Sequence, residues 1–175
     1  MNRRVFVASI AVSLIVSSQA ANSEPGSTCP VTLGSDRVFA APWPQARTWY
    51  GSESLATILS DDGVWTTTKP GHRISVKVFW YSVGFEAGQE TDLTVTVESL
   101  DGAPSSARVD RPTNAYGSAL GAPTMLTGID FPDAGCWRVI AEYKGQELTF
   151  VVETIELEAY REKYVDHRAK NSLRP

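Results

Sequence analysis

The chain has 175 residues, of which 42% are hydrophobic, and it carries 16 lysines and arginines against 20 acidic residues, a formal net charge of −4. This length fits a single domain large enough to own a hydrophobic core. A modestly acidic chain without a basic run lacks the charge pattern typical of proteins that bind nucleic acid or anionic lipid.

Residues 1–20 have the pattern of a secretory signal peptide. Arg3 and Arg4 form a basic start, an apolar run follows over residues 5–16, and small residues end the segment at Ala20. The run is too short and wrongly flanked for a stable membrane anchor. Residues 21–28 are small and polar and predict a flexible leader. We therefore expect an exported protein, periplasmic or extracellular, without membrane insertion after signal cleavage.

The ordered part is expected to begin at Cys29. Residues 34–45 contain Pro42 and Pro44 and predict an extended loop. Apolar runs over residues 55–59 and 64–68 flank an acidic turn that ends in Gly63, which is a hairpin signal. The two turn acids favour a turn-forming role over a catalytic or calcium-binding one, because the ligand pattern of an EF-hand is absent.

The middle of the chain alternates apolar and polar residues with a period of two. Ile74, Val76, Val78 and Trp80 form one apolar row, and residues 93–97 form a second alternating segment. This pattern places one set of side chains on the core face of a strand. Residues 103–123 are rich in Pro, Ser, Ala and Gly, and they predict a long loop that is either functional or mobile.

The last alternating region predicts a β-hairpin over residues 131–154. One strand places Trp137, Val139, Ala141 and Tyr143 on its core face, and the other does so with Leu148, Phe150 and Val152. Gly145 lies between them and can adopt the positive φ that tight hairpin turns require. The whole pattern predicts an all-β, antiparallel Ig-like β-sandwich over residues 29–156.

The remaining residues, 157–175, predict a helical or disordered tail. Leu157, Tyr160, Tyr164 and His167 follow the spacing of one helical face among many charges. We expect disorder beyond Lys170.

Two cysteines, Cys29 and Cys136, favour a disulfide. Their number is even, the chain carries an export signal, and paired cysteines are the norm in exported domains. The alternative is a reactive or metal-binding thiol, but no CxxC motif, nearby histidine or third cysteine supports it. The bridge would join the N-terminal segment to the final hairpin.

Several short motifs together resemble a group of small exported bacterial Ig-like domains without an established activity. The most specific is Phe131-Pro-x-x-Gly-Cys-Trp137, and the others are Cys29-Pro-Val-Thr32, Trp49-Tyr-Gly51 and Leu148-Thr-Phe-Val151. The chain departs from this group where relatives carry a second aromatic residue beside the core tryptophan, and in its tail. The resemblance implies an exported β-sandwich and transfers no catalytic residue.

Residues for catalysis or metal binding form no recognisable arrangement in the sequence. The two histidines, His72 and His167, lie apart from any nucleophile motif, and no zinc-type spacing is present. We expect no catalytic residue, no metal and no cofactor. A pair of carboxylates that meets only in the fold stays open as an alternative.

Exposed aromatic residues provide the material for a binding surface. The expected site combines Lys77, Phe79 and Tyr81 on one face of a strand with Tyr116 in the long loop, because rings stack on sugars and anchor proteins. The alternative is that these rings are buried, as large aromatic residues mostly are. We expect a non-enzymatic binding or structural module that contacts a protein or glycan partner. The runner-up is an exported hydrolase or a hydrolase inhibitor, and a third possibility is an envelope module that makes contact through its tail helix.

Overall fold

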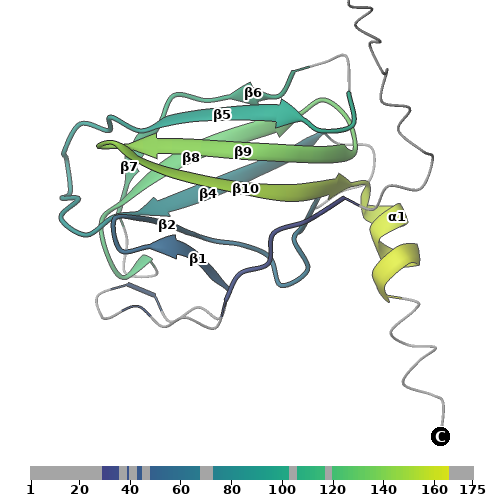
Figure 1. Ribbon diagram of the computed structural model, residues 1–175, viewed down its shortest axis with the longest axis horizontal. Coiled ribbons are helices and arrows are strands. Elements are labelled where there is room, and N and C mark those ends of the chain that lie inside the picture. Colours follow the sequence, from purple (N-terminus) through teal and green to yellow (C-terminus); the bar gives the residue numbers. More distant parts are fainter. Residues whose placement is uncertain are drawn as a thin grey trace, which may run out of the picture.

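The protein is a β-sandwich of two packed sheets with a short helical tail (Figure 1). This computed structural model describes residues 29–35, 39, 43–44, 48–67, 73–102, 106–116 and 120–165. The expected signal peptide, the expected leader and His167 lie outside these residues. The predicted all-β sandwich with a small helical tail is confirmed.

Sheet A contains six strands in the order β1-β2-β4-β8-β6, with β7 also paired to β8. All of its pairings are antiparallel. Its strands are β1 (Trp49–Ser52), β2 (Leu55–Ile58), β4 (Ile74–Tyr81), β6 (Arg108–Val109), β7 (Thr113–Ala115) and β8 (Thr124–Phe131).

Sheet B contains β3 (Val64–Thr66), β5 (Thr94–Ser99), β9 (Gly135–Tyr143) and β10 (Gln146–Ile155), in the order β3-β10-β9-β5. The hairpin predicted around Gly63 is wrong, because β2 belongs to sheet A whereas β3 belongs to sheet B. β3 pairs parallel to β10, so the sandwich is not wholly antiparallel. On β3, the half-buried Trp65 contacts the rings of Phe131 in sheet A and Phe150 in sheet B, and these contacts favour this position of the strand.

The final hairpin is confirmed in its strands, faces and turn. β9 and β10 pair from Tyr143 and Gln146 down to Gly135 and Thr154. The two turn residues have positive φ, 48° at Lys144 and 76° at Gly145. This conformation gives the turn a twist that matches the twist of the flanking strands.

The core lies between the sheets, where the predicted rows meet. Trp80 and Trp137 are fully buried, and Val139 and Ala141 are buried beside them. Each tryptophan N–H donates to a threonine hydroxyl, to Thr127 at 3.2 Å and to Thr154 at 3.0 Å respectively. The assignment of inward and outward faces on these strands is therefore confirmed.

The segment predicted as a long loop, residues 103–123, contains two short strands. β6 and β7 add to the edge of β8, with Val109 beside Ile129 and Asn114 beside Met125. Strands of two and three residues are too short to show an alternating pattern in the sequence. Pro112 lies between them and accepts a hydrogen bond from the Thr91 hydroxyl at 2.9 Å.

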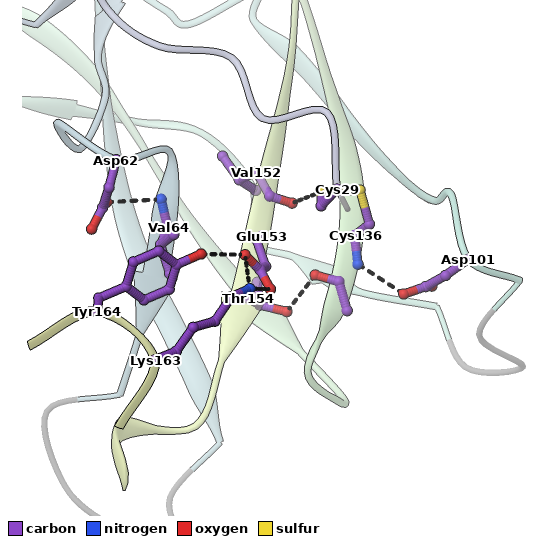
Figure 2. Close-up of polar contacts among 11 residues, drawn as sticks. Cys29, Asp62, Val64, Asp101, Cys136, Val152, Glu153, Thr154, Lys163 and Tyr164 are labelled. Carbon is purple, nitrogen blue, oxygen red and sulfur yellow. Dashed lines mark hydrogen bonds and ion pairs between the residues drawn. A yellow bond between two sulfur atoms is a disulfide. The ribbon is translucent and has the colours of Figure 1, made fainter. Parts of the chain in front are cut away.

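The predicted disulfide joins Cys29 to Cys136, with 5.5 Å between the two Cα atoms. It fastens the N-terminal segment along β10, beside the part of that strand that β3 does not pair. There the Thr32 N–H donates to the Val151 carbonyl at 2.8 Å, and the Val151 N–H donates to the Thr32 hydroxyl at 3.0 Å. Around Cys136, the backbone N–H donates to the Asp101 carboxylate (Figure 2).

The tail begins with α1 (Leu157–Tyr160) and continues as a π-helical turn over Arg161–Val165. Lys163 and Tyr164 both donate to the Glu153 carboxylate, at 2.7 and 2.8 Å (Figure 2). The Tyr160 hydroxyl donates to Asp62 at 2.8 Å. The hydrogen bond to Glu153 raises the pKa of Lys163, whereas partial burial is the main cause that raises the pKa of Tyr164. These contacts hold the start of the tail against the ends of β10 and the β2–β3 turn.

Candidate functional site

The sequence-predicted residues Lys77, Phe79 and Tyr81 do share the outer face of sheet A, but they do not form an exposed aromatic surface. Tyr81 is only 2% exposed, and Phe79 is partly buried against the same cluster. Lys77 alone of the three is exposed. The expectation of two accessible rings beside a cation is therefore wrong.

The cause is a second apolar cluster on the outer face of sheet A. Phe39 and Trp43 fold over this face, and the ring of Trp43 lies 5.5 Å from that of Tyr81. Trp49 packs edge-on against Tyr81 at 4.8 Å. Burial raises the pKa of Tyr81, as expected for a phenol removed from water. The outer face of sheet A is thus partly covered by the chain itself.

Tyr116 is the predicted aromatic residue that does remain accessible, with 76% of its surface exposed. It follows β7 directly, at the edge of sheet A. That Tyr116 belongs to one binding site with Lys77 and Phe79 stays a prediction.

The outer face of sheet B, which the sequence reasoning did not single out, carries exposed and half-buried side chains. It faces the viewer in Figure 1, where β5, β9 and β10 lie side by side. The strand register aligns its outward side chains in three rows across these strands: Thr94–Glu142–Glu147, Thr96–Ile140–Thr149 and Glu98–Arg138–Val151.

The first row borders a cleft of about 360 Å³ at the tip of the hairpin. Asp92, Glu142 and Glu147 contribute carboxylates, and Thr94 and Gln146 contribute neutral polar groups. The Lys144 ammonium also belongs to the lining, and it lies 5.1 Å from the centre of the Tyr143 ring. The cleft is therefore polar, with more acidic than basic side chains.

Charges on this face are distributed unevenly. Glu142 and Glu147 are direct cross-strand neighbours, two positions before and after the turn residues Lys144 and Gly145. Theirs is a non-hydrogen-bonded pair, in which side chains approach most closely. Like charges in that position are unfavourable. Glu98 instead has an opposite charge beside it, because Arg138 donates to it at 3.1 Å. The negative charge thus gathers at the hairpin end of the face.

Part of this face could have been found from the sequence. The alternation that places Trp137 and Val139 inward places Arg138, Ile140 and Glu142 outward, and a two-residue turn sets Glu142 opposite Glu147. The position of β5 beside β9 could not be found this way, because about forty residues separate the two strands and no local pattern pairs them.

Neither metal-ligand groupings nor comparisons with known proteins assign a function to this surface. Within the described ranges, no three His, Cys, Asp or Glu side chains are grouped as a metal site would need. No described helix combines the length and apolar character needed to cross a membrane. Comparisons with protein families, curated proteins and solved structures find no significant match.

Proposed function

We propose that this protein is an exported, non-enzymatic β-sandwich module that recognises a protein partner through the outer face of sheet B. The observation that carries the proposal is the contrast between the two outer faces. The chain covers the aromatic part of sheet A with Phe39 and Trp43, whereas the side chains in the three rows of sheet B are exposed or half-buried and none is fully buried. The disulfide supports export, and the two packed sheets are compatible with the proposed Ig-like family.

The composition of the open face favours a protein over a glycan. Its described outward side chains include threonines, carboxylates, Arg138 and the half-buried Ile140, but no aromatic ring on which a sugar could stack. An apolar centre with a polar surround is the usual composition of a protein interface. The carboxylates at the hairpin end suit a partner that presents basic side chains there.

The proposal is tested by placing a photo-crosslinking residue at Ile140 in cells that export the protein. We expect one discrete adduct, because Ile140 lies in the middle of the three rows. Reversing the charge at the hairpin end with Glu142→Lys and Glu147→Lys should reduce that adduct severalfold, because a basic partner surface would then be repelled.

The matched control carries the same crosslinker at Ser75, which is exposed on the outer face of sheet A. The control should give no such adduct. Equal adducts at both positions, or an Ile140 adduct that is insensitive to the charge reversal, would contradict the proposed face.

A further inference from the structure

β5 is the last strand of sheet B, and no described strand pairs with its outer edge. β5 is six residues long and pairs only with β9. Its sequence, TVTVES, contains no proline and no lysine, and its ladder with β9 has no bulge. Exposed edges of this kind are templates for pairing with another strand, and proteins usually protect them.

Other strand edges in the described part of the chain are bonded by a neighbouring segment or belong to very short strands. Along β10, the carbonyl of Thr149 accepts from the Tyr50 hydroxyl, Val151 bonds with Thr32, and the Glu153 N–H donates to the Gly63 carbonyl. At β1, the Ser35 N–H donates to the Trp49 carbonyl at 2.8 Å. At the far side of sheet A, the edge strands β6 and β7 are only two and three residues long.

The backbone groups that β5 offers follow from its ladder. The Leu100 N–H donates to the Cys136 carbonyl, which makes this pair a hydrogen-bonded one. Hydrogen-bonded and non-hydrogen-bonded pairs alternate in an antiparallel ladder, so Thr96 is bonded to β9 whereas Val95 and Val97 direct their N–H and C=O groups away from it. The outward N–H and C=O groups of Val95 and Val97 are therefore the ones that a further strand would pair with; they are called the template below.

That template is complementary to itself. When two copies pair antiparallel about Thr96, Val95 of each copy lies opposite Val97 of the other, and the two pairs can exchange four backbone hydrogen bonds. On the outer face Thr96 meets its own copy and Glu98 meets Thr94, so no like charges are opposed. A register centred on Val95 would instead set Glu98 against Asp92, and like charges there are unfavourable.

The side chains near this edge fit such a contact. Val97, Ala107 and Val109 pack against the core but are only partly buried. They come from β5 and from the adjacent edge of sheet A, where water still reaches them. A strand added to β5 would cover part of this apolar surface, which provides a driving force beyond the backbone hydrogen bonds.

We propose that β5 pairs with β5 of a second copy of this chain, which joins two four-stranded sheets into one continuous sheet across a two-fold axis. In this dimer both outer faces of sheet B lie on the same side. The dimer does not depend on the function proposed above, because the edge of β5 and the outer face of sheet B are different surfaces.

The test is the oligomeric state of the purified protein, with its disulfide intact, measured by sedimentation equilibrium from micromolar to millimolar concentration. We expect a reversible dimer in which the amides of Val95 and Val97 are protected from hydrogen exchange and lose protection on dilution. Thr96→Lys places two ammonium groups opposite each other at the axis, and it should raise the dissociation constant at least about tenfold.

The matched control is Thr149→Lys, which adds the same charge to the same row of the face but away from the edge, and it should leave the dimer intact. Thr96→Glu alone should weaken the dimer in the same way, because two carboxylates then face each other, and mixing it with Thr96→Lys should restore a tight heterodimer. This restoration separates loss of pairing from loss of folding. A protein that is monomeric at all concentrations, or a dimer that Thr96→Lys does not weaken, would overturn the proposal.

Discussion

At the scale of single residues, the core contains two buried tryptophan N–H groups that are satisfied in the same way. Trp80 and Trp137 are fully buried, and each carries an indole N–H that must find an acceptor away from water. In both cases the acceptor is a threonine hydroxyl from a neighbouring position, Thr127 or Thr154. The tryptophans could be assigned to the core from alternation alone, but their acceptors could not, because both come from side chains outside the apolar rows.

Replacing Trp137 tests this core directly. We expect Trp137→Ala to lower the free energy of unfolding by about 3–5 kcal/mol, because it leaves a cavity between Phe131 and the facing sheet and removes the bond to Thr154. Lys77→Ala, at an exposed position on β4, is the control and should change stability by less than about 0.5 kcal/mol. Both values can be measured by urea unfolding. Similar small effects at the two positions would mean that the faces have been assigned incorrectly.

At the scale of elements, what could be predicted depended on how local each pairing is. The β9–β10 hairpin follows from two alternating runs and a turn that needs positive φ, so its register was accessible from the sequence. The turn before β3 carries an equally plausible hairpin signal, yet β3 pairs with β10, almost ninety residues further along. Turn chemistry specifies where the chain bends but not which strand the next segment will join.

The N-terminal segment on β10 depends on its disulfide. Replacing both cysteines, with Cys29→Ser and Cys136→Ser, should lower the free energy of unfolding by up to about 4–5 kcal/mol, because the bridge closes a loop of 107 residues. The Val151 amide should also exchange faster once Thr32 is released. Urea unfolding and hydrogen exchange measure the two effects.

A companion measurement checks the bridge itself. Thiol titration of the unfolded, unreduced wild-type protein should find no free thiol. Two free thiols, or a double variant as stable as the wild type, would contradict this account of the segment.

At the scale of the whole molecule, the fold class was predictable and the open surface was not. Alternating strands without a helical interruption predict a sandwich, whichever strands pair. Which outer face stays open depends on where residues 39 and 43 fold back, and nothing in their own sequence indicates the covered sheet. For this reason Tyr81 was predicted in a binding surface although it is buried, whereas the rows on sheet B were overlooked.

The limits of the domain can be tested by removing the tail. α1 contains no buried residue, and its Tyr160 donates a hydrogen bond to Asp62. In the π-helical turn that follows, Lys163 and Tyr164 donate to Glu153. Ending the chain after residue 156 should therefore leave the sandwich folded, with a loss of about 1–2 kcal/mol in the free energy of unfolding. Near-ultraviolet circular dichroism reports the packing of the core tryptophans. Loss of that signal in the shortened chain would show that the tail is part of the folding unit.

The position of the disulfide and of the tail has a consequence for orientation. Cys29 is bonded to Cys136, whose strand neighbour Glu153 binds Lys163, so both ends of the described chain lie at one end of β10 (Figure 2). The hairpin turn lies at the other end, about 30 Å away for a ten-residue strand (Figure 1). A tether attached before Cys29 or after α1 would hold the molecule by the same end and point the acidic cleft away from the support. Immobilisation through either terminus should therefore leave the hairpin tip free to meet a ligand in solution.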